Sequence, residues 1–306
     1  MSANDCEAGD IMCCASCGVA DEVKLNECAT CKLARYCSDA CQENHTAQHE
    51  EACKKRAAEL RDEILFKQPD STHHGDCPIC MIPLPLDTSK SSLYSCCSKR
   101  ICIGCHYANH KLREKEEEMP SNSCAFCRQL LPTTEEEYDR KTMKRIEVND
   151  PVALRQWGFR RYSEGDYKGA FEYWTKAAKL GDASAHYELS HSYKEGKGGV
   201  EKDEKKEVQH LEEAAILGHP KARHNLGCHE WSNNDNAERA VKHFIIAATQ
   251  EDDESIEALM FAFKKGCVSK DEFAAALRAH QAAVDAAKSP QREAAEEYLR
   301  KMKSLK

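Results

Sequence analysis

The chain has 306 residues and a formal net charge of −8. No window approaches the roughly 18–20 apolar residues that a membrane span needs, and the first residues, MSANDCEAGD, lack the basic and apolar regions of a signal peptide. We therefore expect an intracellular protein, cytoplasmic or nuclear, without a membrane partner. Residues 1–76 hold 8 Lys+Arg against 15 Asp+Glu and residues 151–306 hold 25 against 26, so no basic surface for nucleic acid is expected.

The cysteines are concentrated in the first part of the chain. Of 19 cysteines, 17 fall in residues 1–127, and only Cys228 and Cys267 lie beyond. In a reducing compartment, cysteine pairs at short fixed spacing indicate metal ligands rather than disulfides. The sequence therefore predicts metal-stabilised modules in its N-terminal half.

The first cysteine array lies in residues 14–53 and offers eight nitrogen or sulfur ligands, which is enough for two tetrahedral zinc sites. Its members are Cys14, Cys17, Cys28, Cys31, Cys37, Cys41, His49 and Cys53. A segment this short cannot bury a sufficient apolar core, so metal binding would supply its folding energy. Cys13 is an alternative to Cys14, but it leaves three residues before Cys17 where two are usual.

The details of this array, including Tyr36-Cys37-Ser38 and Cys41-Gln42, resemble the MYND zinc finger. The resemblance implies an interleaved arrangement. One zinc would be held by Cys14, Cys17, Cys37 and Cys41, and the other by Cys28, Cys31, His49 and Cys53. Thr46 departs from the family, which often has Trp there on its peptide-docking surface, and His45 is expected to lie beside the ligands rather than among them.

A helical linker over residues 54–76 leads to a second cysteine array over residues 77–131. Its pairs are Cys77 and Cys80, Cys96 and Cys97, Cys102 and Cys105, and Cys124 and Cys127. Their order resembles a RING finger, which implies that the first and third pairs share one zinc and the second and fourth pairs share another. Because adjacent residues point differently in an extended chain, Cys96 and Cys97 can bind one ion only at a bend. His106 or His110 is the alternative ligand. We expect four zinc ions in all, two per finger.

The RING resemblance also implies a partner, a ubiquitin-conjugating enzyme. In active members an apolar residue between the first two ligands packs on that enzyme, and a basic residue after the last ligand contacts the ubiquitin thioester. Ile79 and Arg128 occupy these positions, while Ala125 replaces a usual proline. Closed zinc tetrahedra leave no open coordination position, so no catalytic residue is expected in the chain itself.

The region after a second linker, residues 132–150, is rich in alanine and contains an internal repeat. Six small or apolar residues recur 37 positions later: Ala177, Ala178, Leu180, Gly181, Ala185 and Leu189 return as Ala214, Ala215, Leu217, Gly218, Ala222 and Leu226. Ala247, Ala248 and Leu259 give a later copy shortened by four. The alternative without repeats is a plain helical bundle. Seven histidines of this region show no repeated ligand spacing, and we interpret them as surface or packing residues.

The phrases Lys176-Ala177-Ala178-x-Leu180-Gly181 and Tyr193-x2-Gly196 resemble the Sel-one-like repeat, a relative of the tetratricopeptide repeat. The resemblance covers residues 151–285 and implies a surface for protein or peptide substrates, with a capping helix over residues 286–306. The predicted fold is thus multidomain: two small zinc-stabilised modules, MYND and RING-like, followed by an all-α solenoid of helical-hairpin repeats. The predicted function is a RING-type ubiquitin ligase, and the alternative is a non-enzymatic zinc-stabilised scaffold or adaptor.

Overall fold

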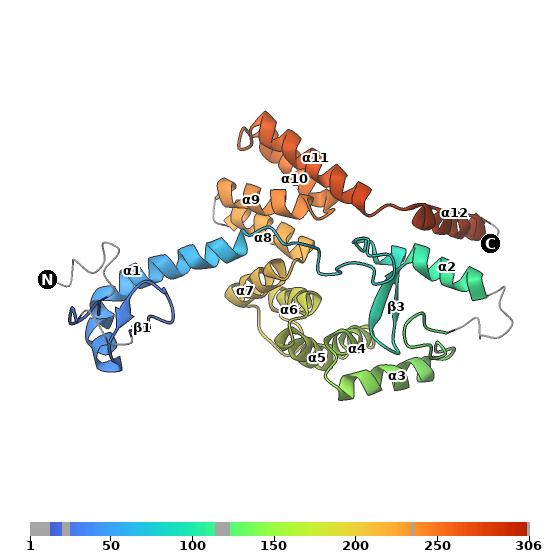
Figure 1. Cartoon of the computed structure of the whole chain (residues 1–306), viewed down its shortest axis with the longest axis horizontal. Helices are drawn as coiled ribbons and strands as arrows, with labels where there is room; N and C mark the ends of the chain where they lie inside the picture. Colours follow the sequence, from blue (N-terminus) through green and yellow to red (C-terminus); the bar gives the residue numbers. More distant parts are fainter. Residues whose placement is uncertain (1–12, 20–24, 114–122, 234–235, 305–306) are drawn as a thin grey trace. The chain divides into compact units, whose positions relative to one another are not determined.

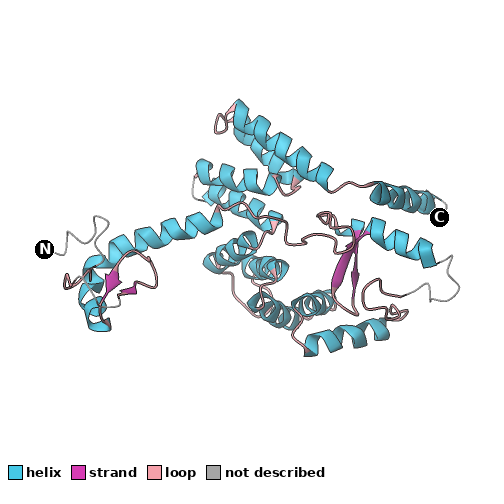
Figure 2. Cartoon of the chain, viewed as in Figure 1, coloured by secondary structure: helices cyan, strands magenta, loops and turns pink. Residues whose placement is uncertain are grey.

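The computed structural model describes residues 13–19, 25–113, 123–233 and 236–304. The chain divides into two compact units, Met1–Lys67 and Gln68–Lys306. Figure 1 gives the order of the elements, and Figure 2 shows that helices predominate in both units. None of the helices in the described ranges is long and apolar enough to cross a lipid bilayer.

The first unit consists of a short hairpin and a long helix. β1 (Asn26–Glu27) pairs antiparallel with β2 (Arg35–Tyr36). α1 (Asp39–Leu65) begins after Ser38, whose hydroxyl accepts from the Cys41 amide and caps the first turn. The helix expected in the linker is therefore longer, and it carries the last three ligand candidates of the first array. Buried cysteines and Tyr36 form nearly the whole core of this unit.

Near its start, the second unit has a hairpin and a helix around which the second cysteine array is arranged. The turn η2 (Thr88–Lys90) leads into β3 (Ser91–Tyr94), which pairs antiparallel with β4 (Lys99–Cys102). α2 (Ile103–Arg113) follows β4 directly, so Cys102 ends the strand and Cys105 lies in the first helical turn. Leu84, Tyr94 and Ile101 are buried among the cysteines.

Helices α4 to α11 form a solenoid in which each helix packs against its neighbours in sequence. Its hairpins are α4 (Pro151–Ser163) with α5 (Tyr167–Lys179), α6 (Ala183–Glu195) with α7 (Glu204–Ile216), and α8 (Pro220–Asn233) with α9 (Ala237–Ala248). α10 (Asp253–Lys264) and α11 (Lys270–Ala286) continue the series, and α3 (Glu135–Glu147) packs against α4 at its start.

The same positions build every hairpin, which confirms the predicted helical repeat. Each first helix begins after a residue whose side chain accepts a backbone hydrogen bond: Asp150, Asp182, His219 and Asp252. The third residue of each first helix is small and no more than 4% exposed: Ala153, Ala185, Ala222 and Ser255. Small residues there allow the paired helices to approach closely.

α12 (Pro290–Ser304) occupies the segment expected to cap the repeats, but it packs against α2 of the second zinc module. This packing is possible because Gly104 of α2 has no side chain. A Cβ atom added at Gly104 of α2 would lie 2.8 Å from the backbone nitrogen of Arg292, so only glycine permits this approach. Ala295, one helical turn later, is fully buried.

Candidate metal centres

Cysteine and histidine side chains gather into four groups in the described part of the chain, with all ligand atoms of a group within 4.8 Å of one another. These groups contain the sixteen ligand candidates expected from the two cysteine arrays, divided into the same four sets that the MYND and RING resemblances imply. The first module holds Cys14, Cys17, Cys37 and Cys41 in one group and Cys28, Cys31, His49 and Cys53 in the other. The second module holds Cys77, Cys80, Cys102 and Cys105, and separately Cys96, Cys97, Cys124 and Cys127.

One Cys-x2-Cys pair in each group is held by the same backbone turn. The amide of the residue after the second cysteine donates to the carbonyl of the first at 2.7–3.1 Å. These donors are Gly18, Lys32, Met81 and Arg128, and their φ angles lie between 55° and 72°, in the left-handed region. We call such a turn a knuckle. Because it points both sulfur atoms toward the same side, the local sequence preorganises half of each group.

The remaining ligand candidates reach the knuckles from helices and strand ends. In the first module, Cys41, His49 and Cys53 lie on one side of α1, and His49 Nε2 is 3.2 Å from Cys31 Sγ. His45 lies outside the groups, with its Nδ1 atom 3.2 Å from the Tyr36 hydroxyl and its ring stacked on that of His49. The first group contains Cys14, not Cys13.

The adjacent Cys96 and Cys97 both join the last group because the chain bends between β3 and β4. Ser98 has a φ of 54°, and its amide donates to the Tyr94 carbonyl at 2.8 Å. As a result, Cys96 Sγ lies 3.3 Å from Cys127 Sγ, and Cys97 Sγ lies 3.6 Å from Cys124 Sγ.

The alternative ligands His106 and His110 stand outside this group. His106 Nδ1 lies 2.9 Å from the Tyr94 hydroxyl, and the rings of the two histidines are 4.6 Å apart. Both side chains line a separate pocket on α2.

The donor sets and their spacing fit zinc. Four sulfur atoms at about 2.3 Å from a tetrahedral zinc ion lie roughly 3.8 Å from one another. The Sγ–Sγ distance is 3.8 Å between Cys28 and Cys53 and between Cys80 and Cys102, and it is 3.6 Å between Cys97 and Cys124 and 3.3 Å between Cys96 and Cys127. Thiolate and imidazole are the ligands that structural zinc sites use, and the four-ligand sets leave no position for a reacting water.

The electrostatics of the groups also call for a cation. A hydrogen bond from Cys102 lowers the pKa of Cys77 to about 4, and the same bond raises the pKa of Cys102 far above its usual range. Hydrogen bonding with Cys41 likewise raises the pKa of Cys37 to about 12. Four neighbouring thiols therefore cannot all ionise unaided, whereas a divalent ion would stabilise all the thiolates together.

Ile79 and Arg128, the expected partner-binding residues, lie on the two knuckles of the second module. Ile79 stands between Cys77 and Cys80 and is 46% exposed. Arg128 is exposed and follows Cys127 in the left-handed conformation. Met81 and Phe126, on the same knuckles, are also exposed apolar residues. The two knuckles thus present apolar side chains and one cation to solvent.

Two families match parts of the sequence. The MYND finger family matches residues 14–53, and the Sel1 repeat family matches residues 151–182, 183–219 and 220–252. The chain carries a MYND finger and three Sel1 repeats. The last Sel1 match ends at the cap of α10, and the buried Ser255 shows that the small-residue pattern continues into that helix.

Three solved structures similar to this chain share little sequence with it. A Sel1 repeat protein from Oxalobacter formigenes has 21% identity and a TM-score of 0.42, covering 52% of this chain and 68% of that one. The antigen c5321 of uropathogenic Escherichia coli, which displays an SLR fold, has 21% identity and a TM-score of 0.39, with coverages of 66% and 41%. An immunity protein from Pseudomonas aeruginosa has 17% identity, a TM-score of 0.39 and coverages of 50% and 62%. No curated protein matches the sequence.

The sequence did not predict one residue that lies beside these centres, Arg292. Arg292 is 4% exposed, and its Nη2 atom lies 3.7 Å from Cys80 Sγ. It stands in a strongly charged helix far along the chain, where an arginine ordinarily indicates a solvated surface.

Proposed function

We propose that this protein is a RING-type ubiquitin ligase. Its second module recruits a ubiquitin-conjugating enzyme, and its MYND finger and Sel1 repeats recruit peptide or protein substrates. The observation that carries the proposal is the crossed pairing in residues 77–131, where the first and third cysteine pairs form one group and the second and fourth form the other. The fifteen cysteines and one histidine of the four groups would hold four zinc ions, in the reducing cytoplasm or nucleus.

The exposed knuckles of the second module support the recruitment step. Ile79 keeps nearly half of its surface in water although it lies between two grouped cysteines. Apolar side chains fixed on a rigid turn can bind a partner at little cost in conformational entropy. Arg128 on the other knuckle provides a cation for the ubiquitin thioester. Ubiquitin transfer itself would use the cysteine of the conjugating enzyme.

The solenoid offers a separate surface for substrates. A groove of about 410 Å³ between α6, α7 and α8 is lined by Tyr193, Lys194, Asn225 and His229, among others. The same groove also contains the carboxylates of Asp203, Glu204 and Glu207, and its mixture of hydrogen-bond donors and acceptors beside a tyrosine suits an extended polar peptide. This surface comes from three helices and lies apart from the second zinc module.

The alternative function is a non-enzymatic scaffold with the same binding modules. Ala125 favours it, because active RING fingers usually have proline at that position beside the last two ligands. In a scaffold, the second module would only stabilise the chain and bind other proteins.

An autoubiquitination assay of the full chain, run with a panel of conjugating enzymes, separates the two functions. Ile79→Ala should lower ubiquitin transfer at least tenfold while the zinc content stays unchanged, since Ile79 is an anchor and not a ligand. Leu180→Ala, which removes an equally exposed apolar residue from the solenoid, serves as the control and should transfer normally. Absence of transfer by the unmodified chain with every enzyme tested would establish the scaffold alternative.

A further inference from the structure

Arg292 joins the C-terminal helix to the first knuckle of the second zinc module. Its Nη1 atom donates to the carbonyls of Pro83 and Ala287 at 2.7 and 2.6 Å. Its Nη2 atom donates to the Ile82 carbonyl at 3.1 Å and to Cys80 Sγ at 3.7 Å. The guanidinium therefore contacts a grouped cysteine and two residues of the loop that follows it, 212 positions away in sequence.

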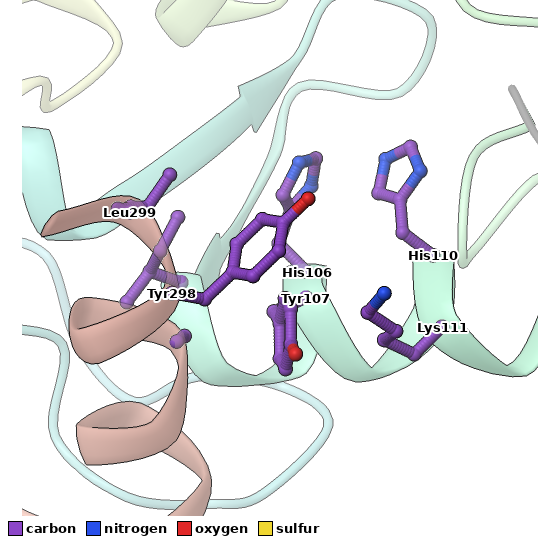
Figure 3. Close-up of a pocket in the computed structure, with 8 residues that line it drawn as sticks. His106, Tyr107, His110, Lys111, Tyr298 and Leu299 are labelled. Atoms are coloured by element: carbon purple, nitrogen blue, oxygen red, sulfur yellow. The ribbon is translucent and has the colours of Figure 1, made fainter. Parts of the chain in front are cut away.

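The neighbouring contacts fix α12 in this position. Besides the close approach at Gly104, Lys90 Nζ lies 3.0 Å from Glu296 Oε1. Farther along the helix, the rings of Tyr107 and Tyr298 are 4.9 Å apart, and Figure 3 shows them facing each other from α2 and α12. The position of Arg292 is thus supported by contacts that α12 makes from Arg292 to Tyr298.

The charge of Arg292 complements that of a zinc site with four thiolates. A divalent ion with four thiolates carries a net charge of −2, and Cys77, Cys102 and Cys105 are buried. Such a site gains from N–H donors and positive charge placed just outside its ligands, and losing an outer hydrogen-bond partner typically lowers metal affinity 10–100-fold. Within the contacts described for this group, Arg292 supplies the guanidinium next to Cys80.

We propose that Arg292 is the counter-ion of the zinc site formed by Cys77, Cys80, Cys102 and Cys105. The C-terminal helix then belongs to the second zinc module and sets how firmly that site retains its metal. This inference depends on zinc binding and not on the proposed ligase function, so an experiment on one does not decide the other.

Arg292 has two other interactions that could explain its burial. It ties together three backbone carbonyls, and its charge also acts on Glu251, whose pKa is raised by burial. A role limited to the carbonyls would require only a donor, and a role limited to Glu251 would be reproduced by removing that carboxylate. The test must therefore separate charge, donor geometry and Glu251.

The experiment measures the rate at which the full, zinc-loaded chain releases metal to an excess of a chelating dye. In Arg292→Gln, which keeps an N–H donor but loses the charge, we expect one zinc equivalent to leave at least tenfold faster and the others to leave at the original rate. Arg292→Lys, which keeps the charge, should recover most of the retention. Arg300→Gln on the exposed side of the same helix and Glu251→Gln should release metal like the unmodified chain.

Three results would overturn the proposal: unchanged release in Arg292→Gln, equal acceleration in the Gln and Lys variants, or the same acceleration in Glu251→Gln. If Arg292→Gln fails to fold, ¹¹³Cd NMR of the cadmium-loaded Arg292→Lys variant tests the contact between residue 292 and the metal site. Each cadmium site gives its own resonance, and altered N–H donation to Cys80 should move one resonance and leave the rest in place. Resonances that all coincide with those of the unmodified chain would refute the contact between Arg292 and the site.

Discussion

Single glycines set the spacing between paired helices of the solenoid. An added Cβ at Gly227 of α8 would lie 2.5 Å from the Phe244 ring of α9, and one at Gly158 of α4 would lie 2.4 Å from the Trp174 side chain of α5. Both aromatic residues are 3% exposed. Each glycine therefore provides the space that a large side chain of the second helix fills.

Gly227→Ala should destabilise the second unit by about 1–3 kcal/mol, because the methyl group overpacks a filled interface. Urea unfolding followed by circular dichroism would measure the change in the free energy of unfolding. Ser190→Ala is the matched control at the equivalent position of α6, and it should cost less because the side chain is shortened. Helix propensity alone predicts that Gly227→Ala would increase the free energy of unfolding by about 1 kcal/mol. A more stable Gly227→Ala variant would therefore show that Phe244 can move aside.

At the residue scale, short-range geometry explains which site features could be predicted. A Cys-x2-Cys pair forms its knuckle from a few consecutive residues, so each pair follows from spacing, whereas the grouping of the pairs followed from the resemblance to the MYND and RING fingers. The participation of both Cys96 and Cys97 depends on the left-handed Ser98, which the sequence does not reveal. The contact of Arg292 with Cys80 is a matter of tertiary packing, and nothing near Arg292 in the sequence indicates it.

The segment after residue 67 is an element without regular structure that crosses two turns of the solenoid. The His73 amide donates to the Gly218 carbonyl at 2.8 Å, and Gln68 Nε2 donates to Thr249 Oγ1 at 2.7 Å. The His73 ring stacks on that of His219 at 4.2 Å, and His219 stacks in turn on Tyr187 at 4.5 Å. Neutral imidazoles thus form part of the packing.

This packing should make the stability of the second unit depend on pH. Burial lowers the pKa of His219 to about 3, well below the usual histidine value of about 6.5. The unfolded chain therefore binds a proton that the folded chain excludes, and stability falls as the pH drops from 6.5 toward 3. One such histidine contributes up to about 1.4 kcal/mol per pH unit in that window.

His219→Asn should reduce this slope, because asparagine can still cap α8 but does not titrate. The measurement is the free energy of unfolding between pH 6.5 and 5.5 for both proteins, with zinc in excess. Thiol protonation affects the two proteins alike, so it cancels in their difference. Parallel pH profiles would contradict the assignment of His219 to the pH effect.

The helical repeat is the element that sequence arithmetic predicted best. Ala177 and Ala214, like Leu189 and Leu226, stand at equivalent buried positions. A repeat is visible in sequence because each copy must present the same small and apolar residues to its neighbours. The location of α12 was not predictable in this way, since its partner Gly104 lies outside the repeats.

At the scale of the whole molecule, the second zinc module and the solenoid fall in one compact unit. Leu93 and Ser98 of the β3–β4 hairpin line a small cavity together with Tyr138 of α3 and Ala153 of α4. The module is thus in contact with the start of the solenoid through its hairpin and with α12 through α2. From the sequence we expected the second zinc module and the solenoid to be separate modules joined by a linker. The tertiary contacts show that they pack together in one unit.

Removal of zinc should therefore weaken the solenoid as well as the fingers. In a fragment of residues 68–306, chelation should lower the midpoint of thermal unfolding of the helices by roughly 4–8 °C, which corresponds to a loss of about 2 kcal/mol at 2–4 °C per kcal/mol for a domain of this size. Added zinc should restore the midpoint. Deleting residues 1–67 should leave the midpoint of the zinc-loaded protein unchanged. A midpoint insensitive to chelation would mean that the repeats do not depend on the metal-binding module.

The contact between Arg292 and Cys80 also has a consequence for protein synthesis. At roughly 5–20 residues per second, the ribosome needs on the order of ten to thirty seconds after finishing the second zinc module before it adds α12. During that interval the nascent second module would have to bind zinc without the Arg292 contact to Cys80. On the proposal above, the site of Cys77, Cys80, Cys102 and Cys105 gains its guanidinium only once α12 has been made, so a chain truncated before α12 should retain that one zinc ion less firmly.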